Sequence, residues 1–199
     1  MKGAAIGVRA HSGWGALVAV SHSAGLIEVL DRQRVTVTAP GTREAIQPYH
    51  FAEGLQLPRA EEFLKNCFAS SKHLAFAALR DVVEELHHRQ YRIVGSAILL
   101  ASGRPLPALA NILASHALIH AAEGVFFRDV FSQSFDSLGI PVTGFPERNL
   151  DNAVQATFGE SATPVCQQIS TLGRSLGPPW TRDQKSAALA ALIVLEKQS

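Results

Sequence analysis

The sequence predicts a single α/β domain, spanning residues 1–199, with a mixed sheet, the element order βββαβαβα and helices on both faces. The first forty residues alternate short apolar runs with turn residues, as an antiparallel meander does. Tyr91–Ala101 is a continuous apolar run, which indicates a central parallel strand covered on both faces. Stretches with helical spacing of apolar residues separate the later strands. At 199 residues the chain can bury one sizeable core.

The meander comes from three apolar segments and two turns. Ser12 and Gly13 supply the chemistry of the first turn. The third strand alternates apolar and polar residues in part, which fits an outer strand with one wet face, extended or bulged around 32–34. The expected strand segments are Ala4–Val8, Gly15–Val20, Ile27–Asp31 and Val35–Thr38, with the second turn at Ser21–Gly25.

The rest of the chain alternates helices with two strands. Residues 40–58 are rich in turn formers and predict a loop, and Pro107 suits the first turn of a helix. The last part is expected to be helical with breaks at Pro164 and at 173–179. The expected segments are a helix at Arg59–Gln90, a strand at Tyr91–Ala101, a helix from Pro107 to about Leu138, a strand at Ile140–Phe145, helical structure from Leu150 and a closing helix at Thr181–Lys197.

Composition narrows the functional classes. A hydrophobic content of 47% with 18% charged residues describes a globular chain. The formal net charge of +1 lacks the basic surplus that proteins gripping nucleic acid through phosphates usually have, so nucleic acid is not favoured as a partner. Cys67 and Cys166 follow no metal or redox spacing, which fits a reduced compartment. Arg9, His11 and Ser12 interrupt the apolar N-terminus, so we expect a cytoplasmic protein without a membrane span.

Two segments carry a family resemblance. Ile6-Gly7-Val8-Arg9-Ala10-His11-Ser12-Gly13-Trp14 and the ending Asp183-Gln184-Lys185-Ser186-Ala187-Ala188-Leu189-Ala190-Ala191-Leu192 resemble the first strand and the final helix of the ribonuclease-H-like superfamily, nearest to its bacterial Holliday-junction resolvase branch. The resemblance implies a ribonuclease-H-like mixed sheet. It also implies an aspartate on the first strand, a glutamate where the central strand ends, and metal-binding acids on the final helix.

The catalytic positions of that family are changed in this chain. Arg9 falls at or beside the aspartate position, the exit of the central strand reads Leu100-Ala101-Ser102, and of the final acids only Asp183 is present, with Lys185 at the neighbouring place. Two-metal nuclease chemistry needs several carboxylates converging on two cations roughly 4 Å apart. These positions do not supply them, so we expect no two-metal nuclease activity.

A separate polar group lies at His116, His120 and Glu123. At about 100° per residue the three side chains point one way on a helix, within an otherwise apolar stripe. Burying these polar side chains without hydrogen-bond or metal partners costs several kcal/mol, so each of them needs such a partner. A divalent metal ion (Zn, Mn or Mg), with His50 or His11 as a further ligand, is one possibility. A hydrogen-bond network in which Glu123 fixes a histidine tautomer, or a wet subunit interface, are the others.

The second candidate site is the edge of the sheet beyond the strand ends, where ligands of open α/β sheets bind. Arg9, His11 and Arg104 are expected there, and two guanidiniums with a histidine suit a phosphate or carboxylate. Alternatively, Arg9 pairs with Glu123 or another acid as a salt bridge. Further ligand-binding candidates near this edge are His50, Glu147 and Lys185.

Three functional hypotheses follow. The first is a catalytically silent module that binds an anionic ligand or a partner at the sheet edge, with an Arg9–Glu123 pair sealing the site. The second is a metal-dependent hydrolase or phosphoryl-transfer enzyme whose catalytic residues are Arg9, His11, His116, His120 and Glu123. The third is a homodimer that uses the long helix after Pro107 as its contact. The missing carboxylates place the silent module first.

Overall fold

The computed structural model describes residues 1–101 and 105–198. Within these ranges five strands form one mixed sheet in the order β3-β2-β1-β4-β5. The strands are β1 (Lys2–His11), β2 (Trp14–Ser23), β3 (Leu26–Thr36), β4 (Tyr91–Leu100) and β5 (Val142–Pro146). The first three form an antiparallel meander, while β4 and β5 run parallel to β1. The predicted α/β class, and the pairing of the opening strand with the central apolar strand, are confirmed.

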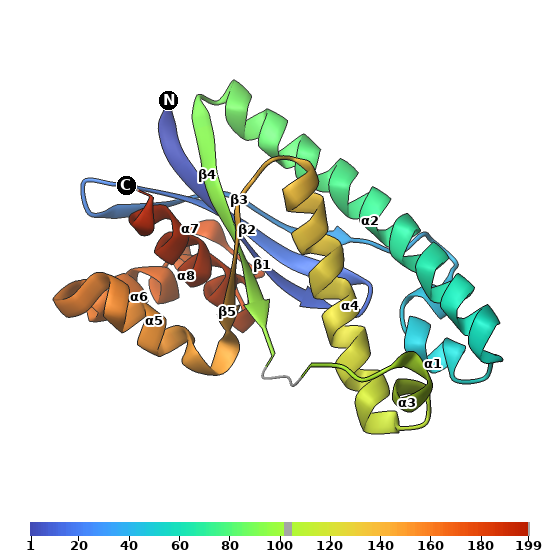
Figure 1. The fold of residues 1–199 in the computed structure, drawn as a ribbon. Coiled ribbons are helices and arrows are strands. Elements are labelled where there is room, and N and C mark those ends of the chain that lie inside the picture. Colours follow the sequence, from blue (N-terminus) through green and yellow to red (C-terminus); the bar gives the residue numbers. More distant parts are fainter. Residues whose placement is uncertain (102–104, 199) are drawn as a thin grey trace.

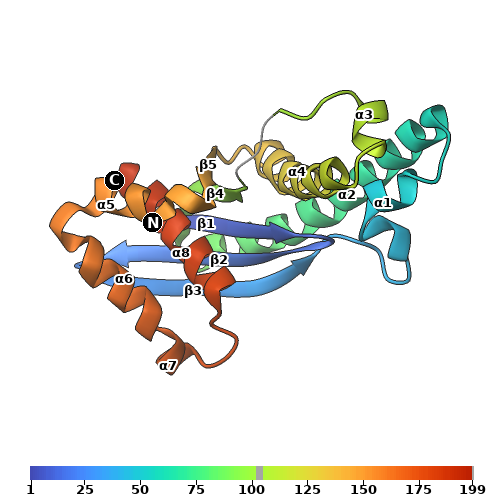
Figure 2. The ribbon, with the colours of Figure 1, turned by 90° about the horizontal axis from the view of Figure 1, so that it is seen from below.

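Helices cover both faces of this sheet. The helices α2 and α4 pack on one face, and α5 to α8 lie on the other (Figure 1). Figure 2 shows α1 and α3 together at one end of the molecule, beside α2 and α4. The helices are α1 (Pro48–Ala52), α2 (Leu57–His88), α3 (Leu109–Leu113), α4 (His116–Ser137), α5 (Leu150–Phe158), α6 (Ala162–Thr171), α7 (Gly173–Leu176) and α8 (Arg182–Lys197).

The alternation of side chains along β1 assigns each residue to one of these two layers. Ile6 and Val8 belong to the core shared with α2 and α4. Ala5 belongs to the core shared with α8. Because Arg9 follows Ala5 by four residues, it emerges on the α8 face, opposite α4. This placement decides which partners Arg9 can reach.

The helical part of the chain differs from the prediction at four places. The predicted break at 173–179 contains the short helix α7 (Gly173–Leu176). The predicted loop 40–58 contains α1. The predicted helix from Pro107 to about Leu138 is two helices, because Ser115 is extended (φ −141°, ψ 112°) between α3 and α4. Pro164 does not break a helix but lies in the first turn of α6, where its missing N–H is tolerated.

The third strand is extended through 32–34, which is one of the two predicted alternatives. It is continuous over Leu26–Thr36, and its register shift lies opposite Ala19 and Val20. No helix in the described ranges has the length and apolar character needed to cross a membrane.

Candidate functional site

At the carboxyl end of β1, Arg9 joins two acids from distant parts of the chain. Its Nε donates to Oε1 of Glu147 at 3.0 Å and its Nη2 to Oε2 at 2.9 Å, a bidentate pair. Its Nη1 donates to Oδ1 of Asp183 at the start of α8. Glu147 follows β5 directly, so the strand order brings both ends together. We call Arg9, Glu147 and Asp183 the arginine cluster.

Two local features bring α8 close enough for this contact. A Cβ atom on Gly7 would lie 1.9 Å from the carbonyl oxygen of Ala187, so only glycine lets the helix approach the strand at this point. Thr181 begins α8 with a capping box, in which Gln184 is the reciprocal partner. The cap fixes the first turn of α8, which carries Asp183.

The surroundings of the arginine cluster keep it half-buried. The side chains of Arg9 and Asp183 are each 21% exposed and that of Glu147 is 33% exposed. The hydrogen bonds to Glu147 raise the pKa of Arg9 further, with the charge of Asp183 adding to the effect against the cost of burial. The guanidinium is therefore a permanent cation held between two carboxylates.

An aromatic stack extends the cluster across the β1–β2 turn. His11 Nε2 lies 3.0 Å from Oδ2 of Asp183, and the imidazole ring stacks on Trp14 with centroids 4.3 Å apart. The guanidinium of Arg34 lies 3.8 Å from the centroid of the Trp14 ring. His11 is thus engaged by an acid and an indole.

The residues at this end of the sheet do not fit the divalent-metal site that the family resemblance implies. Such a site needs carboxylates that converge on the cation. Asp183 and Glu147 converge here, but on the guanidinium of Arg9, which neutralises them and repels a second cation.

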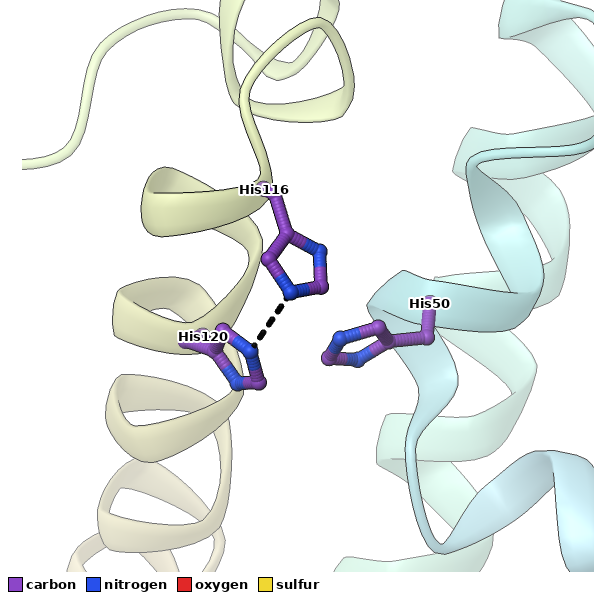
Figure 3. Close-up of side chains that lie close together, drawn as sticks. All are labelled: His50, His116 and His120. Carbon is purple, nitrogen blue, oxygen red and sulfur yellow. Dashed lines mark hydrogen bonds between the residues drawn. The ribbon is translucent and has the colours of Figure 1, made fainter.

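The histidines of α4 lie elsewhere, on the α2 and α4 side of the molecule. His50 of α1 faces His116 and His120 of α4, as Figure 3 shows, and the ligand nitrogens of all three lie within 4.8 Å of one another. The ring centroids are 5.3 Å apart for His50 and His116 and 4.6 Å apart for His50 and His120. We call His50, His116 and His120 the histidine cluster.

Glu123 lies behind the histidine cluster and is 3% exposed. Its Oε1 accepts from Nδ1 of His50 at 2.8 Å and from the backbone N–H of His50 at 3.2 Å. The predicted role of Glu123, fixing the tautomer of a histidine, thus applies to His50, whereas His116 and His120 contact each other through their Nε2 atoms at 3.0 Å. His50 was predicted as a candidate ligand and does join the pair.

Arg9 forms a salt bridge with acids, as one alternative predicted, but its partners are Glu147 and Asp183 and not Glu123, which bonds His50. The prediction that Arg9 and His11 join the histidines of α4 is wrong, because alternation along β1 sends them to the opposite face of the sheet. Arg104 lies outside the described residues.

Lys185 lies apart from the arginine cluster, on another side of α8. It lines an open surface pocket of about 360 Å³ together with Arg174, Ser170 and Trp180 and the loop residues Gly177 and Pro178. This loop is held against the edge strand, since Arg32 of β3 donates to the carbonyls of Leu176, Gly177 and Pro179. We call this the edge pocket. Its lining contains two cations and no acid.

Two residues of these sites, Asp183 and Arg174, carry little functional signal in the sequence. Asp183 fits an ordinary early-turn acid that favours the helix dipole, and only its place in the family resemblance singled it out. No motif around Arg174 in the sequence indicates a function for it. Arg174 and Lys185 line the same pocket only because α6 and α7 fold back on α8.

Comparisons with known proteins support the fold. No family model and no curated protein sequence matches this chain. Among solved structures, T. thermophilus RuvC in complex with Holliday junction substrate is 14% identical, with a TM-score of 0.53 over 96% of this chain and 91% of that one. A second Thermus thermophilus RuvC structure gives a TM-score of 0.51 over 96% and 92% of the two chains, again at 14% identity. The chain thus has the ribonuclease-H-like fold that its sequence predicts.

Proposed function

We propose that the protein is a non-catalytic module on a ribonuclease-H-like fold, which binds an anionic ligand in the edge pocket between α6, α7 and α8. The absence of catalysis is inferred from one observation. Arg9 donates two hydrogen bonds to the carboxylate of Glu147 and also forms an ion pair with Asp183. The family resemblance implies an aspartate where Arg9 stands. A guanidinium here takes the place of the cation that such an aspartate would help to bind.

The charge of Arg9 keeps a divalent ion out of this position. A divalent ion in this position would have to displace a guanidinium that already forms charge-assisted, bidentate hydrogen bonds to a carboxylate. Arg9 cannot lose its proton to make room, since arginine stays protonated in proteins. The cluster is therefore a closed structural contact in place of a metal site.

The edge pocket supports the second part of the proposal. Arg174 and Lys185 face the same space without an acid in the lining, so their charges remain available to an anion. Ser170 adds a hydroxyl and Trp180 an aromatic surface. The indole N–H of Trp180 already donates to the carbonyl of Ile169 at 2.7 Å, which fixes the ring in place. A ligand carrying phosphate or carboxylate groups suits this set.

A nuclease assay tests the non-catalytic part. The intact protein would be incubated with a four-way DNA junction, duplex DNA, single-stranded DNA and RNA, in Mg²⁺ and separately in Mn²⁺. We expect no cleavage above the protein-free blank. Metal-dependent cleavage that disappears in Asp183→Asn would overturn the proposal.

Calorimetric titration with pyrophosphate and with citrate tests the edge pocket and separates phosphate from carboxylate ligands. Arg174→Gln and Lys185→Gln are each expected to weaken binding by about tenfold or more, because a hydrogen bond between charged groups contributes ~1.5–3 kcal/mol. Arg182→Gln, an exposed neighbour at the start of α8 outside the pocket lining, is the matched control. Equal losses in all three variants would contradict a specific pocket.

A second candidate function, a metal-dependent hydrolase, is favoured by the histidine cluster alone. In that case the active site would lie between α1 and α4 and not at the end of β1, and it would require a metal bound to the histidine cluster. A homodimer through the long helix also stays a prediction. The apolar face of α4 is occupied by the sheet and α2, so only its exposed face could meet a second copy.

A further inference from the structure

We infer that His50, His116 and His120 bind a divalent metal ion of the zinc type, with Glu123 as the residue that positions His50. The inference is independent of the proposed anion-binding module, because the histidine cluster and the arginine cluster lie on opposite faces of the sheet, and it supplies the metal that the second candidate function requires. Three features support this inference. The three imidazole rings converge, the second ring nitrogen of His50 contacts Glu123, and all three candidate ligands are imidazole nitrogens.

The three rings already have nearly the spacing that a metal needs. With Zn–N distances of about 2.0–2.1 Å, tetrahedral geometry places ligand nitrogens roughly 3.3 Å apart. The Nε2 atoms of His116 and His120 are 3.0 Å apart, and all three ligand nitrogens lie within 4.8 Å of one another. His116 and His120 are one helical turn apart on α4, and Figure 3 shows the ring of His50 directed at this pair from α1.

Glu123 gives His50 the arrangement that metal-bound histidines show. Such histidines donate their second ring N–H to a carboxylate, which fixes the tautomer and makes the free nitrogen a better ligand. His50 Nδ1 lies 2.8 Å from the Glu123 carboxylate, so Nε2 is left for the ion. The contact also explains why a carboxylate that is 3% exposed is placed here, because a bound cation nearby offsets the cost of burying its charge.

The donors favour one class of metal. An all-imidazole set suits zinc and its neighbours cobalt, nickel and copper, whereas magnesium and manganese prefer oxygen ligands. We therefore expect the site to bind zinc in preference to manganese and magnesium. Since His116 and His120 are exposed, water or a small anion can reach a fourth coordination position.

Metal titration of tag-free protein, stripped with a chelator, tests the inference. We expect one Zn²⁺ per chain by calorimetry and a rise in melting temperature on its addition. Co²⁺ should give the intense visible absorption of a tetrahedral site, and azide should shift that spectrum if the fourth position is open. His116→Ala and His120→Ala remove exposed side chains, so they are expected to fold normally and to lose binding.

Matched variants separate a built site from surface binding. His88→Ala, which removes an exposed histidine of α2 outside the cluster, should bind Zn²⁺ like the unmodified protein. Glu123→Gln should weaken binding by about 10–100-fold, as loss of a partner behind a ligand does, and should shift the Co²⁺ spectrum without abolishing it. Binding that is the same in the unmodified protein and in the His116→Ala, His120→Ala double variant would overturn the inference, as would no binding at all.

Discussion

Arg9 of β1 and Glu147, which follows β5, form a bidentate ion pair across 138 residues of sequence, with N–O distances of 3.0 Å and 2.9 Å. The strand order β1-β4-β5 is what brings them together, because the two parallel pairings align the ends of these strands. Asp183 completes the contact from α8, which covers the face of the sheet on which the Arg9 side chain lies. The pair therefore ties the sheet, the segment after β5 and α8 into one unit.

Replacing Arg9 should destabilise the protein. Arg9→Gln leaves two half-buried carboxylates facing each other without a cation, and we expect a loss of about 1–3 kcal/mol in the free energy of unfolding. Arg9→Lys keeps the charge but not the bidentate geometry, so its loss should be smaller. Urea denaturation measures both. A change for Arg9→Gln no larger than for the exposed Arg182→Gln would show that the cluster contributes nothing.

Gly7→Ala should be among the most costly single changes in β1. The added Cβ meets the backbone carbonyl of Ala187, which cannot rotate away, so α8 must shift. We expect a loss of about 3 kcal/mol, at the upper end for overpacking. Gly3→Ala, in the same strand, meets the flexible side chain of Leu195 at 3.4 Å and is the control. Thermal unfolding of the two variants should differ clearly, and similar melting temperatures would contradict the close approach.

The protein should lose stability at alkaline pH because of Tyr49. Burial, together with the charges of Asp129 and Glu123, raises the pKa of this phenol above its ordinary value of 10.0. The unfolded chain then loses the proton before the folded chain does, so stability is full below that ordinary value and falls as the pH rises above it. Tyr49→Phe should flatten this fall in urea denaturation measured across the alkaline range. An unchanged slope in the variant would assign the effect elsewhere.

Zinc should slow hydrogen exchange in α1. This helix has five residues, too few to be stable alone, and the proposed metal would fix His50 to α4. Exchange measured by mass spectrometry should decrease in the α1 peptide on addition of Zn²⁺ and stay unchanged in His120→Ala. Equal exchange with and without zinc in the intact protein would argue against a link between α1 and α4.

The sequence predicted the sheet better than the helices. The strands β1, β2 and β4 are buried and therefore consist of apolar runs bounded by turn residues, a pattern that can be recognised in the sequence. The helix α1 escaped prediction because one and a half turns leave no periodicity to detect. The break between α3 and α4 was missed because its one sequence signal is Ser115, a common N-cap residue, inside a segment whose apolar spacing fits a single helix.

The candidate site was predicted in its residues but not in its pairings. His50, His116, His120, Glu123, Arg9 and Glu147 were all singled out by type and position. Their partners depend on tertiary placement, since Arg9 reaches Asp183 only because Gly7 admits α8 to the strand. Arg9 and Glu123 do not pair because the side chain of Arg9 lies on the face of β1 opposite α4. The alternation of side chains along the strand is enough to predict that face.

Manganese binding at the end of β1 tests most directly whether Arg9 replaces a metal. The measurement is a Mn²⁺ titration, followed by electron paramagnetic resonance, in a His116→Ala, His120→Ala background that removes the histidine cluster. We expect no binding in this background. Binding should appear once Arg9→Asp is added, since carboxylates from three segments then converge without a cation. Mn²⁺ binding in the background protein that disappears with Asp183→Asn would contradict it.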